Sequence, residues 1–168
     1  MKMVPISEIT DELWYEIYLT VYSKEMAYHM GIDPRLIVNP PPLVQFYESV
    51  MAQVEKGLGY GWAMVKDGKY IGHVIMDKRS GEWEIATAIP DASNRRGYGV
   101  KATYHAMKWV FDEQGDGWII AYTQGKDPKV KEMLSKVGFK PFMNFMVFDR
   151  RTWEERGPQW RKLDVSTA

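Results

Sequence analysis

A short glycine-containing stretch, Asn94–Ala102, constrains this chain more than any other segment. The residues before it, Glu82–Ile89, favour a strand, and the apolar residues after it recur at helical spacing. Gly97 and Gly99 therefore fall between a strand and the start of a helix. Because glycine has no Cβ, the backbone there can approach a ligand closely. The first amides of a helix lack internal partners and lie at the positive end of its dipole, so the stretch predicts an anion site, most naturally for a phosphate or pyrophosphate.

Two common nucleotide-binding motifs fit this stretch poorly. A Walker loop ends in Gly-Lys-Ser/Thr, but Gly99 is followed by Val100 and Lys101. A dinucleotide fingerprint tolerates Ala102 at its last position, yet it needs the strand at the front of a βαβ unit. Here the strand comes after an expected antiparallel hairpin, so this alternative is weak.

The stretch resembles the acetyl-CoA loop of the GCN5-related N-acetyltransferases, usually written Gln/Arg-x-x-Gly-x-Gly/Ala. Gly97 and Gly99 match its last two fixed positions, and Asn94 stands where the family usually has Gln or Arg. A second segment, Asp127–Phe139, resembles the family's other signature, a short helix that ends in Gly-Phe and packs beside the cofactor. The resemblance extends from about residue 57 to residue 148, and the N-terminal third agrees only in its helix pattern.

This resemblance implies an α/β (α+β) fold, in which a mixed, mostly antiparallel central sheet of about six strands is flanked by helices in three α/β/α layers. We expect one domain over residues 1–168, with a C-terminal extension over 150–168. The implied activity is transfer of an acetyl group from acetyl-CoA to a primary amine of a small molecule or peptide. The alternative is a domain that keeps the acyl-CoA cleft with little or no catalysis and acts as a protein-interaction module. A homodimer is left open.

Composition limits the other functions. The 45% hydrophobic and 26% charged residues are ordinary for a globular protein of 168 residues. Lys plus Arg and Asp plus Glu both number 22, which argues against nucleic-acid or membrane partners. With no cysteine, and with three histidines that share no ligand spacing, we expect no metal. The chain has no long apolar run and no signal-peptide pattern, so we expect a cytoplasmic protein.

Periodicity and turn signals predict the order of the elements. The expected strands are residues 1–6, 60–65, 70–76, 82–89, 118–123 and 142–148. The expected helices run from the Thr10 N-cap to about residue 29, from 43 to about 56, from 97 to about 114, and from 127 to about 137, with a short helix after 150. The turn at residues 66–69 predicts a hairpin.

The resemblance also places the cofactor. The free amides of Ala88 and Ile89 would hold the pantetheine arm. The pyrophosphate would lie on the amides of the glycine loop, with an arginine side chain in support, so the loop residues concerned are Arg95, Arg96, Gly97, Tyr98, Gly99 and Val100. The start of the second signature adds Asp127, where the family often has asparagine, and Lys129.

The candidates for proton transfer are Glu84, His73 and Tyr122. Glu84 lies where many family members place a glutamate that acts as a base, although a solvent-facing strand glutamate is an equal alternative, and Glu82 is the reserve. His73 has a suitable pKa for proton transfer, but a lone histidine in an apolar strand is more often a core residue.

The family often has a tyrosine that protonates the departing thiolate. Leu134 stands at that position, and a leucine cannot donate a proton. Tyr122, at the end of the strand that faces the cofactor, is the substitute, with packing as its alternative role.

Overall fold

A seven-stranded sheet in the order β1-β2-β3-β4-β5-β7-β6 forms the centre of the molecule. The computed structural model describes residues 1–29, 35, 39–90, 97–123 and 125–156. Only β4 and β5 are parallel, and every other neighbouring pair is antiparallel. The strands are β1 (Lys2–Pro5), β2 (Gly59–Lys66), β3 (Lys69–Asp77), β4 (Trp83–Ala88), β5 (Trp118–Tyr122), β6 (Lys140–Phe142) and β7 (Phe145–Asp149).

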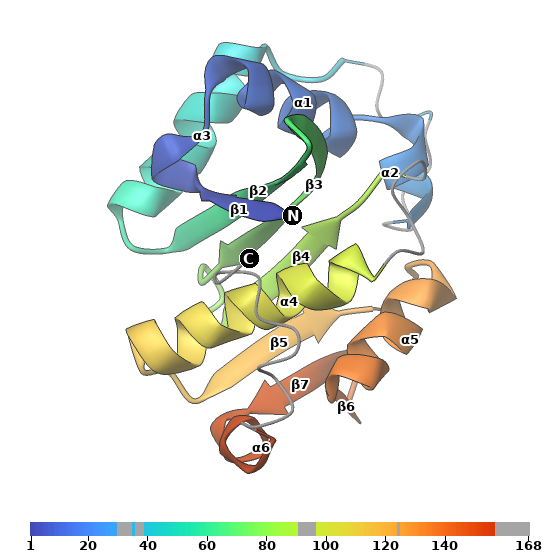
Figure 1. Cartoon of the computed structure of the whole chain (residues 1–168). Coiled ribbons are helices and arrows are strands. Elements are labelled where there is room, and N and C mark those ends of the chain that lie inside the picture. Colours follow the sequence, from blue (N-terminus) through green and yellow to red (C-terminus); the bar gives the residue numbers. More distant parts are fainter. Residues whose placement is uncertain (30–34, 36–38, 91–96, 124, 157–168) are drawn as a thin grey trace.

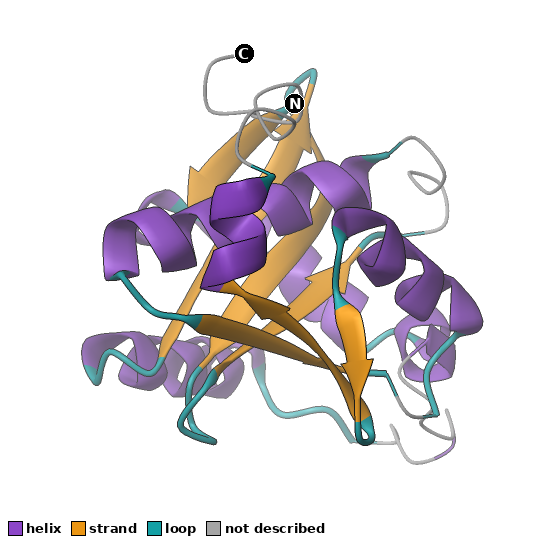
Figure 2. Cartoon of the chain, turned by 90° about the horizontal axis from the view of Figure 1, so that it is seen from below, coloured by secondary structure: helices purple, strands orange, loops and turns teal. Residues whose placement is uncertain are grey.

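Helices cover both faces of this sheet (Figures 1 and 2). They are η1 (Ile6–Glu8), α1 (Asp11–Val21), α2 (Lys24–His29), α3 (Leu43–Glu55), α4 (Tyr98–Lys108), η4 (Trp109–Gln114), α5 (Pro128–Val137) and α6 (Arg150–Glu155). Figure 1 shows α4 lying across β4 and β5, while α1 and α3 gather at the β1–β3 end. The expected mixed sheet between helical layers is confirmed, with seven strands where about six were predicted.

The first helical layer packs on β1, β2 and β3. Thr10 caps α1 as predicted, because its Oγ1 accepts a hydrogen bond from the Leu13 amide at 3.3 Å. Ile17 of α1 is buried against Val4 and Ala63 on the sheet. This cluster fixes the side of the sheet on which α1 and α3 lie.

The helix predicted from Thr10 to about residue 29 is in fact two helices, α1 and α2. Ser23 explains the break. Its hydroxyl donates to the carbonyl of Thr20 at 2.8 Å and accepts from the amide of Met26 at 3.1 Å. A serine that bonds to the amide three residues later caps a new helix, so the chain ends α1 and starts α2 at this point.

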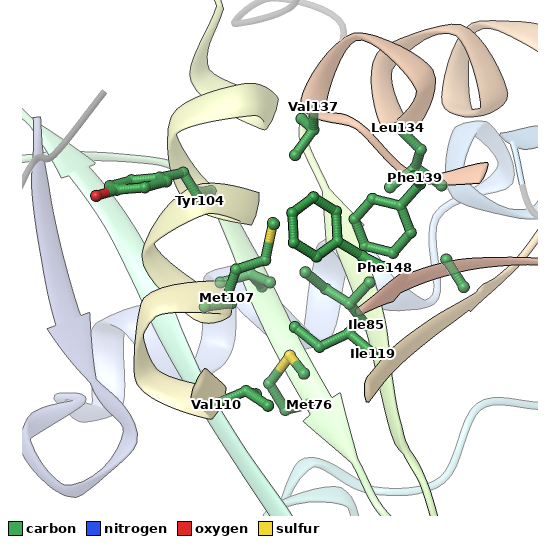
Figure 3. Packing of buried hydrophobic residues seen from close by; sticks show 14 of the residues in the cluster. Met76, Ile85, Tyr104, Met107, Val110, Ile119, Leu134, Val137, Phe139 and Phe148 are labelled. Carbon is green, nitrogen blue, oxygen red and sulfur yellow. The ribbon is translucent and has the colours of Figure 1, made fainter. Parts of the chain in front are cut away.

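The second layer buries the larger core (Figure 3). Met107 and Val110, which belong to the α4–η4 helical run, pack on Met76, Ile85 and Ile119 of the sheet. Each fully buried side chain of this kind stabilises the fold by roughly 1.5–3 kcal/mol relative to an exposed one. This core holds α4 firmly against β4 and β5.

The hairpin between β2 and β3 has the predicted turn. Asp67 and Gly68 both have positive φ angles, 51° and 74°, as a two-residue turn of the favoured hand requires. The strand predicted over residues 142–148, by contrast, is a second hairpin, β6 and β7. Met143 turns the chain with a φ of 54°, a conformation that methionine seldom adopts, so no turn signal is present in the sequence.

The helix expected after residue 150 docks on the body as α6. Trp153 is buried and donates through Nε1 to Asp112 at 2.9 Å, and Arg150 donates to the carbonyl of Phe111 at 2.8 Å. These contacts attach α6 to η4, a π-helical turn that continues α4. Trp160, the other tryptophan of this extension, lies outside the described residues.

Candidate functional site

The main cavity opens where β4 and β5 part. The two strands pair only at Trp83 with Ile119 and at Glu84 with Ile120. Beyond that point they diverge, and a cleft of about 530 Å³ lies between them. On its other side β4 stays paired with β3 as far as Ala88. From Ile85 onward, the edge of β4 that faces the cleft therefore has backbone N–H and C=O groups that are not paired with any described strand. A ligand can form hydrogen bonds with these groups.

The walls of the cleft come from distant parts of the chain. Residues of β4, β5, the first turn of α4, the loop after β5, and α5 contribute, together with one residue of α2. The lining residues are Met26, Ile85, Ala86, Thr87, Ile89, Gly97, Tyr98, Gly99, Val100, Ala121, Tyr122, Lys126, Asp127, Lys129, Val130, Glu132, Met133, Leu134 and Lys136.

The N-terminus of α4 forms one wall. Gly97 is its N-cap, with φ 76° in the left-handed region that favours glycine. No side chain among the described residues caps this first turn. A Cβ added to Gly99 would lie 3.2 Å from Cδ1 of Ile89, so glycine keeps this wall open. All four residues from Gly97 to Val100 consequently line the cleft.

Another wall is formed by α5 and the residues just before it. The Asp127 carboxylate accepts from the Lys129 amide at 3.0 Å, and this bond caps the helix. Burial lowers the pKa of Lys126, and the nearby Glu84 carboxylate opposes that shift. Lys136 forms an ion pair with Glu132 at 3.2 Å. This wall therefore carries three lysines and two acidic residues, and Lys136 and Glu132 are paired with each other.

The interior of the cleft is apolar, and side-chain contacts connect the elements around it. Leu134 is only 3% exposed and lies in the core beside Phe139 (Figure 3). Thr103 of α4 is buried, with its hydroxyl 3.4 Å from that of Thr87 on β4 and 3.7 Å from the Met133 sulfur on α5. These contacts connect α4, β4 and α5, so the packing of the fold itself holds the walls of the cleft in place.

The structure brings most of the expected cofactor residues together. Ile89, Gly97, Tyr98, Gly99, Val100, Asp127 and Lys129 all line the cleft. Ala88 is buried next to it at the end of β4. Arg95 and Arg96 lie outside the described residues.

Tyr122 is the one catalytic candidate that lines the cleft. Its side chain is 38% exposed, and its ring lies 5.8 Å from that of Phe145. Glu84 lies two residues before Ala86, on the same side of β4, but is not part of the lining. Burial raises the pKa of Glu84, Asp77 adds to that increase, and Lys126 opposes it.

His73 lies away from the cleft. It is 3% exposed on β3, and its Nδ1 is 2.7 Å from the Tyr70 hydroxyl. It borders instead a small apolar hollow near Ile17 of α1. Burial lowers the pKa of His73 to about 4. This environment matches the core interpretation of the histidine.

Sequence reasoning missed several residues of the lining. Thr87 lies two residues after Ile85 on β4 and therefore on the same face of the strand, so the period of two could have identified it. Met26 comes from α2, far away in the chain, and no local pattern connects it to the cleft.

Two kinds of feature are absent from the described residues. Within residues 1–29, 35, 39–90, 97–123 and 125–156, no three His, Asp or Glu side chains come together as a metal site would require. Over the same ranges, no helix has the length and apolar character needed to cross a membrane.

Solved structures share this fold at low sequence identity. Spermidine N-acetyltransferase from Vibrio cholerae, in complex with CoA and spermine, is 12% identical with a TM-score of 0.70, over 87% of this chain and 95% of that one. Aminoglycoside acetyltransferase AAC(6')-Ib, in complex with coenzyme A and kanamycin, is 15% identical with a TM-score of 0.69, over 92% and 98%. Ribosomal-protein-S5-alanine acetyltransferase from Vibrio fischeri is 14% identical with a TM-score of 0.68, over 86% and 92%.

Comparison at the sequence level identifies the family. No curated protein matches the chain significantly. A family model described as an acetyltransferase (GNAT) domain matches residues 8–140, which is most of the chain. The glycine loop and the whole of the second signature, Asp127–Phe139, lie inside that match. The chain therefore belongs to the GNAT acetyltransferase family.

Proposed function

We propose that the protein is an N-acetyltransferase that transfers the acetyl group of acetyl-CoA to a primary amine. One observation carries this proposal: β4 and β5 separate directly beside the glycine-bordered N-terminus of α4, whose first turn no described side chain caps. An extended acyl arm can bind along the open edge of a strand, and a diphosphate binds at a helix N-terminus. The similar structures that contain CoA agree with this use of the fold.

The residues of the cleft suit each part of the co-substrate. The backbone of Ala88 and Ile89, where β4 ends, would hold the pantetheine arm. The amides from Gly97 to Val100 would hold the pyrophosphate, and Lys129 of α5, which lines the same cleft, would add positive charge. The apolar interior around Leu134 would shield the thioester from water.

The thioester is already activated, so the protein mainly has to hold the two reactants in line. The neutral amine nitrogen forms the new bond to the thioester carbonyl carbon. The C–S bond breaks, and the thiolate leaves with the electron pair. The amine's proton must then pass to a base, and the thiolate must gain a proton.

Two residues are proposed for these proton transfers. Glu84 would accept the proton through an intervening water, because it lies two residues before the lining residue Ala86 on the same side of β4 but is not itself part of the lining. Its raised pKa brings it closer to neutral pH, where a general base works best. Tyr122, which lines the cleft, would protonate the thiolate in place of the missing tyrosine at position 134.

The interaction-module alternative is favoured by one observation, the buried Leu134 at the position of the expected acid. Trp14 and Trp153 are both buried in the core. They are therefore not available as a partner surface.

Two measurements separate the alternatives. Thermal stabilisation by acetyl-CoA tests binding in the cleft, and release of free thiol with a panel of primary amines tests turnover. The transferase is supported by stabilisation together with thiol release that depends on the amine. Stabilisation without turnover on a broad panel would favour the interaction module. No stabilisation of the folded protein by any coenzyme A species would contradict both.

A further inference from the structure

Three aromatic side chains form a continuous row that starts inside the cleft. The row consists of Tyr122 on β5, Phe145 on β7 and Phe142 on β6. Tyr122 pairs with Phe145, and Phe142 pairs with Phe145, so all three side chains lie on the same face of the sheet. The ring centroids of successive members are 5.8 Å and 5.6 Å apart.

The row is exposed at both ends. Tyr122 is 38% exposed and Phe142 is 58% exposed, and Met143 in the next turn is more exposed still. Large apolar side chains scattered singly on a surface need no explanation, but a contiguous group of them marks a binding surface. This group continues directly into the cleft, because Tyr122 belongs to both.

The row lies on the same side of the sheet as the proposed base. Glu84 is in register with Ile120, which precedes Tyr122 by two residues on β5. Side chains in register, and side chains two residues apart on a strand, lie on one face. An amine that receives the acetyl group beside Glu84 would therefore extend the rest of its skeleton across the row.

The charges of the cleft do not favour an acceptor that carries several positive charges. Lys126, Lys129 and Lys136 all line it. Of its two acidic lining residues, Asp127 caps α5 and Glu132 pairs with Lys136. The lysines outnumber these acidic residues by only three to two, so the lining offers a polyamine no excess of negative charge, whereas an apolar ring would meet the aromatic row.

We propose that the acceptor is a primary monoamine with an aromatic ring, and that this ring packs on the row formed by Tyr122, Phe145 and Phe142. The assignment rests on the proposed transferase activity and specifies its substrate class. The ring would gain edge or stacked contacts with Phe142 and Phe145 while the amino group reaches the cleft.

The test compares kcat/KM for three amines in the full-length protein with acetyl-CoA: 2-phenylethylamine, n-propylamine and spermidine. We expect 2-phenylethylamine to exceed each of the other two by roughly tenfold, the value of one well-packed aromatic contact. Phe142→Ala should lower kcat/KM for 2-phenylethylamine by roughly fivefold and leave that for n-propylamine unchanged. Phe142→Leu, which keeps apolar bulk, should restore part of the loss.

Trp118→Ala is the matched control. Trp118 is an exposed aromatic residue on the same face of β5, four residues from Tyr122 and thus roughly 13 Å away along the strand. Its replacement should change neither rate. Melting curves establish that each variant is folded, which the exposure of both residues favours.

The outcomes are distinct. Selective loss of aromatic-amine turnover in Phe142→Ala supports the assignment. Turnover of amines with no preference for the ring, or an equal loss for both amines in Phe142→Ala, overturns the assignment but leaves the transferase standing. Absence of thiol release with every amine overturns the transferase and the assignment with it.

Discussion

Gly99 of α4 and Ile89 at the end of β4 meet at the inner wall of the cleft, where a Cβ on Gly99 would lie only 3.2 Å from the Ile89 Cδ1 atom. The same Cβ would lie 3.8 Å from Met133 of α5. A side chain at position 99 would therefore extend into the space between α4, β4 and α5. The glycine leaves the first amides of α4 accessible from the cleft.

Replacement of Gly99 by tryptophan should block the cleft. We expect Gly99→Trp to lose the thermal stabilisation by acetyl-CoA, which in the unchanged protein should amount to about 2.7 kcal/mol at a hundredfold excess of ligand over Kd. Gly117→Trp is the control, because a Cβ there meets no atom within 4 Å and the residue lies outside the cleft. Retention of the full shift in Gly99→Trp would place the ligand elsewhere.

Removal of the Tyr122 hydroxyl tests the proposed acid. Tyr122→Phe keeps the ring contact with Phe145 and so preserves packing. If the hydroxyl protonates the thiolate, kcat should fall by roughly a hundredfold while acetyl-CoA binding is unchanged. Rapid-quench or steady-state thiol release gives kcat, and calorimetry gives the affinity. An unchanged kcat would mean that the Tyr122 hydroxyl does not protonate the thiolate and that the side chain contributes only packing.

Glu84→Gln tests the proposed base. Because burial raises the pKa of Glu84, its ionised form should be lost at a higher pH than for an ordinary glutamate. The acid limb of the kcat/KM profile should accordingly lie above the usual glutamate range, with the rate falling as pH decreases. Glu84→Gln should abolish that limb and lower the rate by roughly a hundredfold. Glu82→Gln, at the exposed start of the same segment, should behave like the unchanged protein.

The buried His73 should make stability depend on pH. Its pKa is about 4 in the folded protein, against 6.5 for an exposed histidine. Between these values the unfolded chain binds a proton that the folded protein does not. The free energy of unfolding should therefore be highest above pH 6.5 and decrease as the pH falls towards 4, by up to about 3 kcal/mol.

Urea unfolding at pH 7 and pH 4.5 measures this decrease. The other titrating groups contribute too, so the comparison is between the unchanged protein and His73→Gln, whose side chain can still hydrogen-bond to the Tyr70 hydroxyl. The variant should show a smaller loss of stability at pH 4.5. Equal decreases in the free energy of unfolding in the two proteins would mean that protonation of His73 does not destabilise the folded state.

Local signals predicted the parts of the fold that local interactions produce. The Thr10 cap, the turn at Asp67 and Gly68, and the start of a helix near residue 127 each depend on a few neighbouring residues, and the structure contains all three. The two errors, at Ser23 and Met143, have a common cause. Serine favours helix starts, but no glycine or proline marks a break near Ser23, and methionine rarely takes a positive φ angle, so neither position gives a clear boundary signal.

The sequence by itself determined the glycine loop, the second signature and the order of the elements, because these depend on residue types at fixed spacing along the chain. Only the tertiary structure decided which side chains share the cleft. His73 and Tyr122 are both strand residues, yet the register of the sheet turns His73 towards α1 and leaves Tyr122 at the point where β4 and β5 separate. Side chains on a strand alternate between two faces, so the partners on each face are set by which strands pair and where the pairing ends.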